Sequence, residues 1–358
     1  MLAVRTPIGT TFHVPERIEE DAPYFTADSL TDARDYYGQH GYVVLRGLIA
    51  PAACARARAA FDATVRPSAT PLLRQATMRY ERHVLDSDGF LANAIFNVQD
   101  LGTGPLGGFR NAALDILAHP ATAAATAALL ECTQTKLVQS RFFEAPAGTW
   151  AHQDSYYQDS AARLGGGVAG WFALEDIDAG AGRFYVCPGS HRSLPPLRNE
   201  GAHNVATRHD AYRAAMLEAM RSQKLPIAAP FLAAGDVLFW NSLTVHGSLA
   251  ASRTGVSRCS LTAHYLDATD AMLQFHSRIR AQRTLQYNGM TIGLLHDHDR
   301  MRNRVLRSFA FRLPGPYMAV QRLALRAVLA RHARRRAHAA PPSEDVAPVS
   351  EREKQSNL

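Results

Sequence analysis

Cysteine is scarce in this sequence, and the few cysteines stand far from one another. The four are Cys54, Cys132, Cys187 and Cys259, and no two of them have the C-x-x-C spacing of a metal or redox motif. A disulfide framework and a zinc knuckle both need cysteines at close, repeated spacings. We therefore expect isolated, reduced thiols, as in a cytoplasmic protein.

Long apolar runs are missing as well. No uninterrupted run approaches the roughly 18 residues that a membrane-spanning helix requires. The first residues, MLAVRTPIGTTFHV, lack the basic start and apolar stretch that are typical of a secretory signal. A hydrophobic share of 47% over 358 residues is still enough for one large core. We predict a cytoplasmic location and one large domain with additions.

Acidic residues are absent between Arg312 and His338, where seven arginines lie. Of the 39 Lys and Arg residues, the seven removed leave 32, which equals the 32 Asp and Glu. The net charge of +7 thus belongs to this segment, and we expect no binding of nucleic acid. Two interpretations of the segment stay open, namely a helix that lies on an anionic membrane surface and a helix that packs on the parent domain.

Helical patterns dominate the N-terminal third of the chain. We predict a helix over 28–40, a short strand at 42–45, and an Ala- and Arg-rich helix from Pro51 to about Val65. The stretch 107–132 predicts two further helices, divided at His119-Pro120.

The texture changes after Lys136, where short β-branched or alternating runs recur between turn signals. These runs are KLVQSRFFEAP, GVAGWFALEDI, GRFYVCPGS, GDVLFWNSLTVHGS and SRCSLTAHYLDA. Regularly spaced short strands of this kind indicate a double-stranded β-helix, that is, a cupin-like jelly roll, over about 136–270. A helical insert at roughly 210–221 interrupts them. The expected fold class is mainly β with flanking helices.

We expect three parts along the chain. Residues 1–315 form a single domain, with its N-terminal helices over 28–132. Residues 316–340 form a basic amphipathic helix, in which apolar side chains make one stripe. Residues 341–358 are polar and of mixed charge, which predicts a disordered tail.

One short motif is typical of a metal site. His152 and Asp154 are separated by one residue, so on a strand both side chains project from the same face. His246 is the best candidate for a third ligand. Two histidines and one carboxylate leave three open positions on a metal, an arrangement that suits ferrous iron. The H-x-D spacing alone is weak, because a histidine on a strand is more often a core or surface residue.

The neighbouring blocks give the motif its context. In order along the chain they are GYVVLRGLI, VQSRFF, WAHQDSYY, WFALEDIDAGAGRFYVCPGSHRS, GDVLFWNSLTVHGS and SRCSLTAHY. Together they span most of residues 40–266, and in this order they resemble the phytanoyl-CoA dioxygenase family of iron(II)- and 2-oxoglutarate-dependent oxygenases, which includes ectoine hydroxylase. The joint presence of H-x-D, PGSH and HGS followed by Arg is specific to that family.

The resemblance implies roles for several residues. His152, Asp154 and His246 take the positions of the catalytic iron ligands. Arg258 takes the position that pairs with the distal carboxylate of 2-oxoglutarate, for which arginine is chemically suited. Three further residues take positions at the oxo acid, namely Gln139, Ser248 and Trp171. The family often has a second arginine before the first, whereas this chain has Ser257, so Arg253 in a turn is the runner-up.

Two residues are candidates for contact with the primary substrate. Arg141 lies on the same expected strand face as Gln139, and a surface salt bridge is its alternative interpretation. Tyr156 follows the metal motif and could equally fill the core. His264 is expected to be a core histidine rather than a fourth ligand. The run His296-Asp297-His298-Asp299 is expected in an exposed loop without metal.

The resemblance implies Fe(II), 2-oxoglutarate and O₂ as cofactor and co-substrates. The implied reaction is hydroxylation of an unactivated C–H bond in a small-molecule or lipid-like metabolite, with release of succinate and CO₂. Desaturation, epoxidation and cyclisation are alternative outcomes. A non-redox metal protein on the same jelly roll is the rival, but it would have no use for an oxo-acid arginine.

Overall fold

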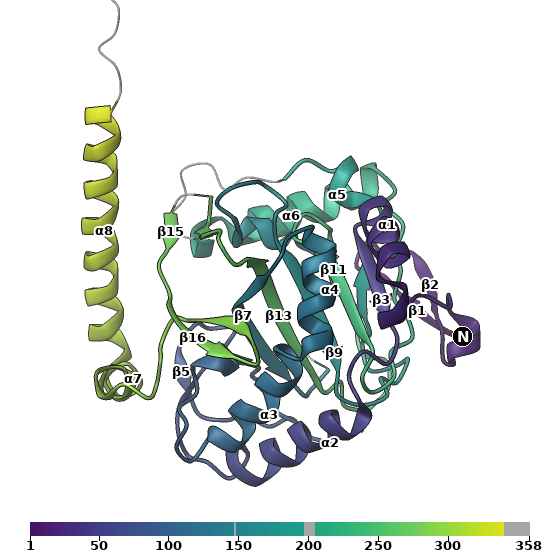
Figure 1. The fold of residues 1–358 in the computed structure, drawn as a ribbon, viewed down its shortest axis with the longest axis horizontal. Helices are drawn as coiled ribbons and strands as arrows, with labels where there is room; N and C mark the ends of the chain where they lie inside the picture. Colours follow the sequence, from purple (N-terminus) through teal and green to yellow (C-terminus); the bar gives the residue numbers. More distant parts are fainter. Residues whose placement is uncertain (147, 197–204, 277, 340–358) are drawn as a thin grey trace, which may run out of the picture. The chain divides into compact units, whose positions relative to one another are not determined.

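The structure, a computed structural model, describes residues 1–146, 148–196, 205–276 and 278–339 (Figure 1). The chain divides into two units, Met1–Phe311 and Arg312–Leu358. The first unit contains the sheets and seven of the labelled helices. The tail predicted at 341–358 lies outside the described residues.

An eight-stranded sheet forms the centre of the first unit. Its neighbouring strands are mostly antiparallel, while β7 and β17 pair in parallel. In spatial order they are β16 (Arg283–Tyr287), β17 (Met290–Leu294), β7 (Thr135–Phe143), β13 (Ser260–Asp267), β9 (Val168–Ala173), β11 (Val237–Asn241) and β3 (Tyr42–Leu45), with β6 (Ile95–Phe96) paired to β7. The short strands predicted beyond residue 136 and at 42–45 are confirmed.

A small second sheet covers one face of the large one. It consists of β10 (Phe184–Val186) and β12 (His246–Ser248) in antiparallel pairing. Phe184 packs with its ring centroid 6.2 Å from that of Trp171 and 4.8 Å from that of Trp240, both on the large sheet. Two facing sheets enclose a core between them, as in a jelly roll. The predicted fold class is confirmed.

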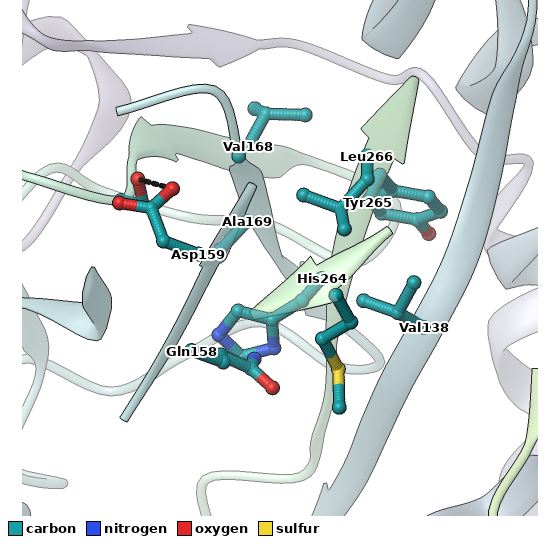
Figure 2. A pocket seen from close by; sticks show the side chains of 11 residues that line it. Val138, Gln158, Asp159, Val168, Ala169, His264, Tyr265 and Leu266 are labelled. Atoms are coloured by element: carbon teal, nitrogen blue, oxygen red, sulfur yellow. Dashed lines mark hydrogen bonds between the residues drawn. The ribbon is translucent and has the colours of Figure 1, made fainter. Parts of the chain in front are cut away.

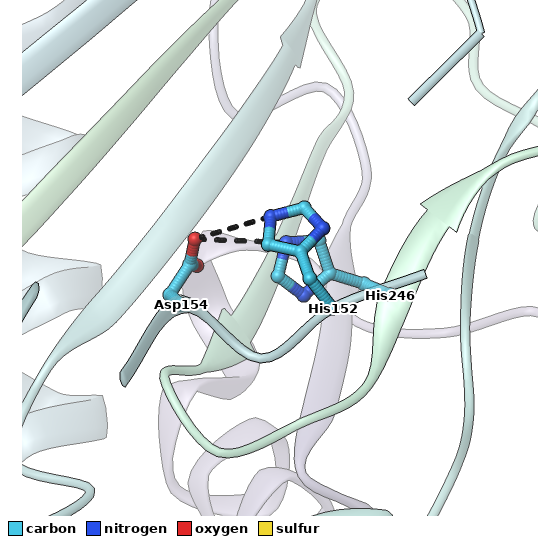
Figure 3. A group of neighbouring side chains, drawn as sticks. All are labelled: His152, Asp154 and His246. Atoms are coloured by element: carbon cyan, nitrogen blue, oxygen red, sulfur yellow. Dashed lines mark ion pairs between the residues drawn. The ribbon is translucent and has the colours of Figure 1, made fainter. Parts of the chain in front are cut away.

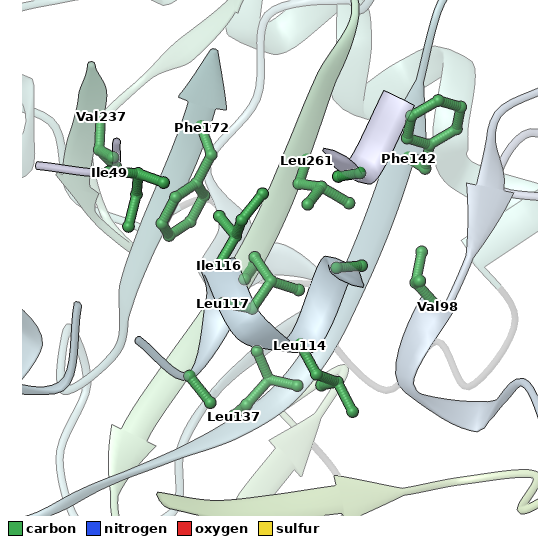
Figure 4. Packing of buried hydrophobic residues seen from close by; sticks show 14 of the residues in the cluster. Ile49, Val98, Leu114, Ile116, Leu117, Leu137, Phe142, Phe172, Val237 and Leu261 are labelled. Carbon is green, nitrogen blue, oxygen red and sulfur yellow. The ribbon is translucent and has the colours of Figure 1, made fainter. Parts of the chain in front are cut away.

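Helices cover the opposite face of the large sheet (Figure 1). They are α2 (Pro51–Ala60), α3 (Gly107–Leu117) and α4 (Pro120–Leu130). Leu117 of α3 is buried in one cluster with Leu137 and Leu261 of the sheet (Figure 4). Full burial of such a side chain stabilises the fold by roughly 1.5–3 kcal/mol. Pro120 is the first residue of α4, which confirms the predicted division of 107–132.

Strand alternation separates these two environments. Along β13, Leu261 and Tyr265 belong to the helix-side core. Thr262 and His264 lie between them in sequence and therefore project to the other face, toward the small sheet. The polar residues of the strand are thus directed to the interior of the jelly roll, where the site described below lies.

The end of α1 (Leu30–His40) is tied to the loop that leads into β12. Gly41 follows the helix with φ +78°, and a Cβ at this position would come within 2.6 Å of Thr244 Oγ1. The Thr244 hydroxyl donates to the Gly41 carbonyl at 2.7 Å. Glycine is required here by both its backbone angle and the close approach, and the contact fixes the residues just before His246.

The remaining elements of the first unit are short sheets and peripheral helices. They are β1 (Leu2–Arg5), β2 (Thr11–Val14), β4 (Leu72–Leu73), β5 (Tyr80–Glu81), β8 (Gln158–Ser160), β14 (Met272–Gln274), β15 (Arg278–Arg280), α5 (Ser190–Ser193), α6 (Val205–Ser222) and α7 (Met301–Arg312), which ends at the first residue of the second unit. The predicted helical insert is therefore present and longer than expected. The helix predicted over 51–65 ends at Ala60 and continues as one π-helical turn to Val65.

The second unit contains α8 (Pro314–Ala339). Among its described side chains, Val320 is 58% exposed and Leu323 is 64% exposed. Contact of this helix with a membrane surface stays a prediction. In the described part of the chain, no single helix is long and apolar enough to cross a bilayer. Among those residues, only α3 and α4 taken together have that length and apolar character, and a 47° bend separates the two.

Candidate metal centre

Three side chains that are distant in sequence meet inside the jelly roll. His152, Asp154 and His246 offer ligand atoms that all lie within 4.8 Å of one another (Figure 3). The Nε2 atoms of both histidines are 3.7 Å from Asp154 Oδ1. Among the described residues this is the group of three or more potential ligands close enough to hold one metal ion. The three candidate ligands named from the sequence are thus brought together.

The local backbone differs from the expected strand. His152 forms an isolated bridge with His246, with N–H to carbonyl distances of 3.0 Å in both directions. Gln153 is extended, at φ −106° and ψ 134°, and Asp154 then begins a 3₁₀ turn that reaches Tyr156. One extended residue is enough to bring the two side chains to the same side, as a strand would also do.

Backbone carbonyls orient both imidazoles. His152 Nδ1 lies 2.9 Å from the Trp150 carbonyl oxygen, and His246 Nδ1 lies 2.9 Å from the Thr244 carbonyl oxygen. A carbonyl only accepts, so each Nδ1 carries the proton and donates. Each Nε2 then keeps a lone pair directed toward Asp154. This is the outer-sphere arrangement that supports metal-binding histidines.

Burial keeps His246 neutral, as a ligand must be. Desolvation and the neighbouring His152 lower the pKa of His246 to about 3. Burial alone would raise the pKa of Asp154, but His264 and His246 outweigh it whenever they carry a proton, so that this pKa lies well below its usual range. Near neutral pH the site therefore offers one carboxylate and neutral imidazole to a divalent cation.

Two residues at the site were not assigned a role there from the sequence. Trp240 Nε1 donates to Asp154 Oδ2 at 2.8 Å. His264 Nε2 lies 3.1 Å from Asp154 Oδ1. Both are buried on the inner face of the large sheet. The alternation of β11 and β13 could have shown which way they point, but not that they reach Asp154.

A small cavity lies beside His264 (Figure 2). Its volume is about 10 Å³, and its lining includes Gln158, Asp159 and Met272. That volume corresponds to roughly one water molecule, so no organic substrate fits on this side of the site. Neither side-chain atom of Gln158 has a hydrogen-bond partner among the described residues.

Gln139 and Arg141 lie next to the triad on β7, on one face, as predicted. Arg141 Nη2 donates to Gln139 Oε1 at 2.6 Å, and Arg141 Nη1 lies 3.3 Å from His264 Nδ1. The β7–β13 register places Gln139 opposite His264. Burial lowers the pKa of Arg141, and its Nε has no hydrogen-bond partner among the described residues. A surface salt bridge, the alternative for Arg141, is therefore wrong.

Trp171 and Ser248 line the same interior from the two sheets. Trp171 is buried on β9, directly opposite Thr262 of β13. Ser248 is buried on β12, and its Oγ accepts from the Thr149 backbone N–H at 2.6 Å. Their expected contact with the oxo acid stays a prediction.

The two candidate arginines for the oxo acid differ sharply in environment. Arg258 is buried just before β13 and donates to the Gly182 carbonyl, and burial lowers its pKa to about 10. Arg253 is exposed and forms ion pairs with Asp178 at 2.9 Å and Glu16 at 2.7 Å. An exposed arginine that already pairs with two acids is poorly suited to capture an oxo acid, whereas a buried guanidinium suits a carboxylate.

Tyr156 is buried behind the metal motif. Its ring stacks on that of Tyr212 from α6, with centroids 3.7 Å apart and planes 14° apart. The Tyr212 hydroxyl also accepts from the Gln153 backbone N–H at 2.9 Å. The stack anchors α6 to the 3₁₀ turn that carries Asp154. The predicted contact of Tyr156 with substrate stays a prediction.

The His296–Asp299 segment was predicted to lie in an exposed loop, and the exposure holds for Asp299 but not for the two residues before it. Asp297 and His298 are buried. The carboxylate of Asp100, in the turn before α3, accepts from the backbone N–H groups of Leu295 and His296 at 3.0 Å each. Buried backbone donors must be satisfied within the protein, and this carboxylate does so.

Known proteins resemble this chain in family and in fold. A family model described as Phytanoyl-CoA dioxygenase matches residues 37–259. The crystal structure of EctD from S. alaskensis in its apoform is 17% identical, with 79% of this chain and 95% of that chain covered and a TM-score of 0.51. The carbocyclase SnoK, described as non-heme and alpha ketoglutarate dependent, from nogalamycin biosynthesis, is 18% identical, with 70% and 89% covered and a TM-score of 0.50. No curated protein sequence matches the chain.

Proposed function

This chain belongs to the phytanoyl-CoA dioxygenase family, and we propose that it hydroxylates an unactivated C–H bond of a small-molecule or lipid-like metabolite. Family membership makes it a 2-oxoglutarate-dependent dioxygenase that uses iron. In the proposed reaction the substrate C–H, 2-oxoglutarate and O₂ give the alcohol, succinate and CO₂. One oxygen atom of O₂ enters the alcohol and the other enters succinate.

The convergence of His152, Asp154 and His246 supports this proposal most strongly. Two neutral imidazoles and one carboxylate fit Fe(II), and they occupy half of an octahedral ion. When bound, iron with the oxo acid and O₂ supplies the oxidising power for C–H cleavage. The Nδ1 contacts of the two histidines with backbone carbonyls hold the donor atoms in place before any metal arrives.

Arg258 is proposed to bind the distal carboxylate of 2-oxoglutarate. A buried guanidinium can form two parallel hydrogen bonds with a carboxylate, and the low local dielectric strengthens them. Ser248, Trp171 and Gln139 are proposed to line the rest of the oxo-acid site, from β12, β9 and β7. The Gln139 carbonyl already accepts from Arg141, so its amide nitrogen is the group left to donate.

Arg141 and Tyr156 are proposed to face the primary substrate. Arg141 lies beside the triad, with its Nη1 3.3 Å from His264 Nδ1. An arginine in this place favours substrates with a polar or anionic group near the reacting carbon. Hydroxylation is preferred over halogenation because Asp154 supplies the carboxylate that related halogenases replace with Ala or Gly.

Turnover of 2-oxoglutarate tests the proposal directly. Purified protein with Fe(II) and ascorbate should release succinate when the right metabolite of a broad panel is added, and the product should gain one oxygen atom. Asp154→Ala should release none. Stoichiometric metal without succinate on any metabolite would favour the rival, a non-redox metal protein. A product with no added oxygen would instead show desaturation or cyclisation.

A further inference from the structure

His264 lies closer to Asp154 than either proposed histidine ligand does. Its Nε2 is 3.1 Å from Asp154 Oδ1, against 3.7 Å for His152 and His246. The residue is buried on the inner face of β13, between two strands that both pair with it. A histidine in this place either binds the metal, fills space or acts on the carboxylate. The hydrogen-bonding groups around the ring decide between these roles.

The proton on the His264 ring can be assigned from its neighbour. Arg141 Nη1 lies 3.3 Å from His264 Nδ1. A guanidinium only donates, so Nδ1 must accept and carries no proton. In a neutral imidazole the proton then sits on Nε2, which is the atom beside Asp154 Oδ1.

Arg141 is itself held in the orientation that this assignment needs. Its Nη2 donates to Gln139 Oε1 at 2.6 Å, and its guanidinium carbon lies 5.5 Å from the ring centroid of Phe96 on β6. The β7–β13 pairing sets Gln139 opposite His264. The contact between Arg141 and His264 is therefore set by strand register rather than by a flexible loop.

We propose that His264 is a positioning residue whose Nε2–H holds the metal-facing oxygen of Asp154, and that Arg141 selects the tautomer that makes this contact possible. Trp240 holds the other oxygen, at 2.8 Å. His264 Nε2 is buried and has no aligned hydrogen bond among the described residues, so its N–H is the donor that can turn onto Oδ1 while Trp240 holds Oδ2. The inference rests on the proposed metal site, and it assigns the chain's own support for one ligand of that site.

The same geometry argues against His264 as a fourth ligand. In the assigned tautomer, Nε2 carries a hydrogen and Nδ1 faces a guanidinium, so neither nitrogen offers a lone pair to a cation. The group of mutually close ligand atoms in the described residues contains His152, Asp154 and His246 without His264. His264 thus acts through Asp154 rather than on the metal.

Two substitutions separate positioning from packing. His264→Gln retains an amide N–H that can reach the Nε2 position, whereas His264→Leu retains bulk and removes the donor. Outer-sphere partners of metal ligands typically change affinity by about 10- to 100-fold. We expect His264→Leu to weaken Fe(II) binding, measured without oxygen, by about that factor, and His264→Gln to recover most of it. The visible absorption band of the Fe(II)–2-oxoglutarate complex should shift in the Leu variant and return in the Gln variant.

A matched control is His298→Gln, which replaces a buried histidine outside the triad. It should leave Fe(II) affinity unchanged. Folded His264→Leu protein with wild-type affinity and an unshifted band would overturn the inference, as would equal weakening by Leu and Gln. If the wild-type chain binds no Fe(II), or Asp154→Ala binds it as tightly, the proposed metal site fails instead.

The tautomer can be measured in the wild-type chain, which covers the case in which His264→Leu does not fold. The ¹⁵N chemical shifts of a neutral imidazole differ between the protonated and the unprotonated nitrogen. In metal-free protein with labelled histidine, we expect the proton of His264 on Nε2, and in Arg141→Met a loss of that preference. A proton on Nδ1 in the wild-type chain would overturn the inference.

Discussion

Two segments of this chain place histidine and aspartate close together in sequence, and the structure uses them in opposite ways. In the first, His152 and Asp154 direct their polar atoms to a common point with His246. In the second, His296–Asp299, the polar atoms of Asp297, His298 and Asp299 are directed to different neighbours. Both segments offer residue types that bind metals, and what decides between them is where the lone pairs point.

The partners in the second segment show this dispersion. Asp297 pairs with Arg283, and Asp299 accepts from Thr103. His298 Nε2 lies 3.3 Å from the Tyr80 hydroxyl, and its Nδ1 lies 3.4 Å from Arg307 Nη1. Ligand atoms already engaged with separate partners cannot also converge on one ion. A metal site needs residues of the right type whose donor atoms are still uncommitted and share one focus.

Removal of a carboxylate from each segment should break the comparison most clearly. Asp154→Ala should weaken Fe(II) binding by about 100-fold or more, since even outer-sphere partners change it by about 10- to 100-fold. Asp297→Ala should leave Fe(II) binding unchanged. Anaerobic titration with Fe(II) measures both. Similar losses in the two variants would show that the second segment also contributes to metal binding.

The two candidate arginines for the oxo acid, Arg258 and Arg253, allow a second comparison. Arg258→Gln should raise the dissociation constant of 2-oxoglutarate by roughly 10- to 150-fold, because a charged hydrogen bond contributes about 1.5–3 kcal/mol. Arg258→Lys should recover part of the affinity. Arg253→Gln removes an exposed arginine and should have no effect. Titration of the Fe(II) protein with 2-oxoglutarate is the measurement, and a larger loss in Arg253→Gln would reverse the assignment.

Added metal should stabilise the folded chain through its contacts with the first segment and not through the second. A ligand at 100 times its dissociation constant stabilises the fold by about 2.7 kcal/mol. Mn(II), as a redox-stable substitute, should raise the melting temperature of the wild-type chain and of His298→Gln but not that of Asp154→Ala, and a chelator should remove the gain. An equal gain in Asp154→Ala would place the ion elsewhere.

Asp100 should contribute to the stability of the fold and not to metal binding. Its carboxylate accepts from Leu295 N, His296 N and Asn97 Nδ2, so Asp100→Ala leaves buried donors without an acceptor. We expect a loss of roughly 2–4 kcal/mol in the free energy of unfolding, since each such group costs about 1–3 kcal/mol. Denaturant unfolding at pH 5 is the measurement, because the pKa of Asp100, which burial raises to about 7, leaves the folded carboxyl uncharged there, whereas at higher pH the cost of a buried charge would offset part of the loss. Wild-type stability would show that the segment is held by other contacts.

The pH dependence of stability gives the smallest effect. Burial lowers the pKa of His296 to about 4 and that of His298 to about 3, from an ordinary value of 6.5. Between pH 6.5 and these lowered pKa values, the unfolded chain binds more protons than the folded one. The free energy of unfolding therefore falls as the pH falls below about 6.5. One group contributes at most about 1.4 kcal/mol per pH unit. Metal-free His298→Gln should therefore show a shallower slope from pH 6.5 to 4.5, and an unchanged slope would contradict a buried neutral His298.

Much of the fold follows from local patterns. The break between α3 and α4 follows from Pro120, and the short strands from alternating apolar runs between turns. The errors arise where tertiary contacts override local polarity. The charged look of His296–Asp299 predicted exposure, but Asp100, nearly 200 positions earlier, supplies the acceptor that allows burial. No local pattern contains that information.

The sequence by itself determined which residue types are available to the site and in what order. Family-like blocks around His152, Asp154, His246 and Arg258 were enough to name candidates, because the chemistry of iron and of a carboxylate co-substrate restricts the choice of side chain. The same reasoning rejected the His296–Asp299 segment, although it gave exposure as the reason.

Only the tertiary structure decided which lone pairs meet. The approach of His246 to Asp154, the carbonyls that fix both imidazoles, and the contacts of Trp240 and His264 with the carboxylate all join residues far apart in the chain. Hydrogen bonds depend on distances of a few tenths of an ångström and on direction. Strand register and sheet packing set those quantities, and a linear pattern of residues does not contain them.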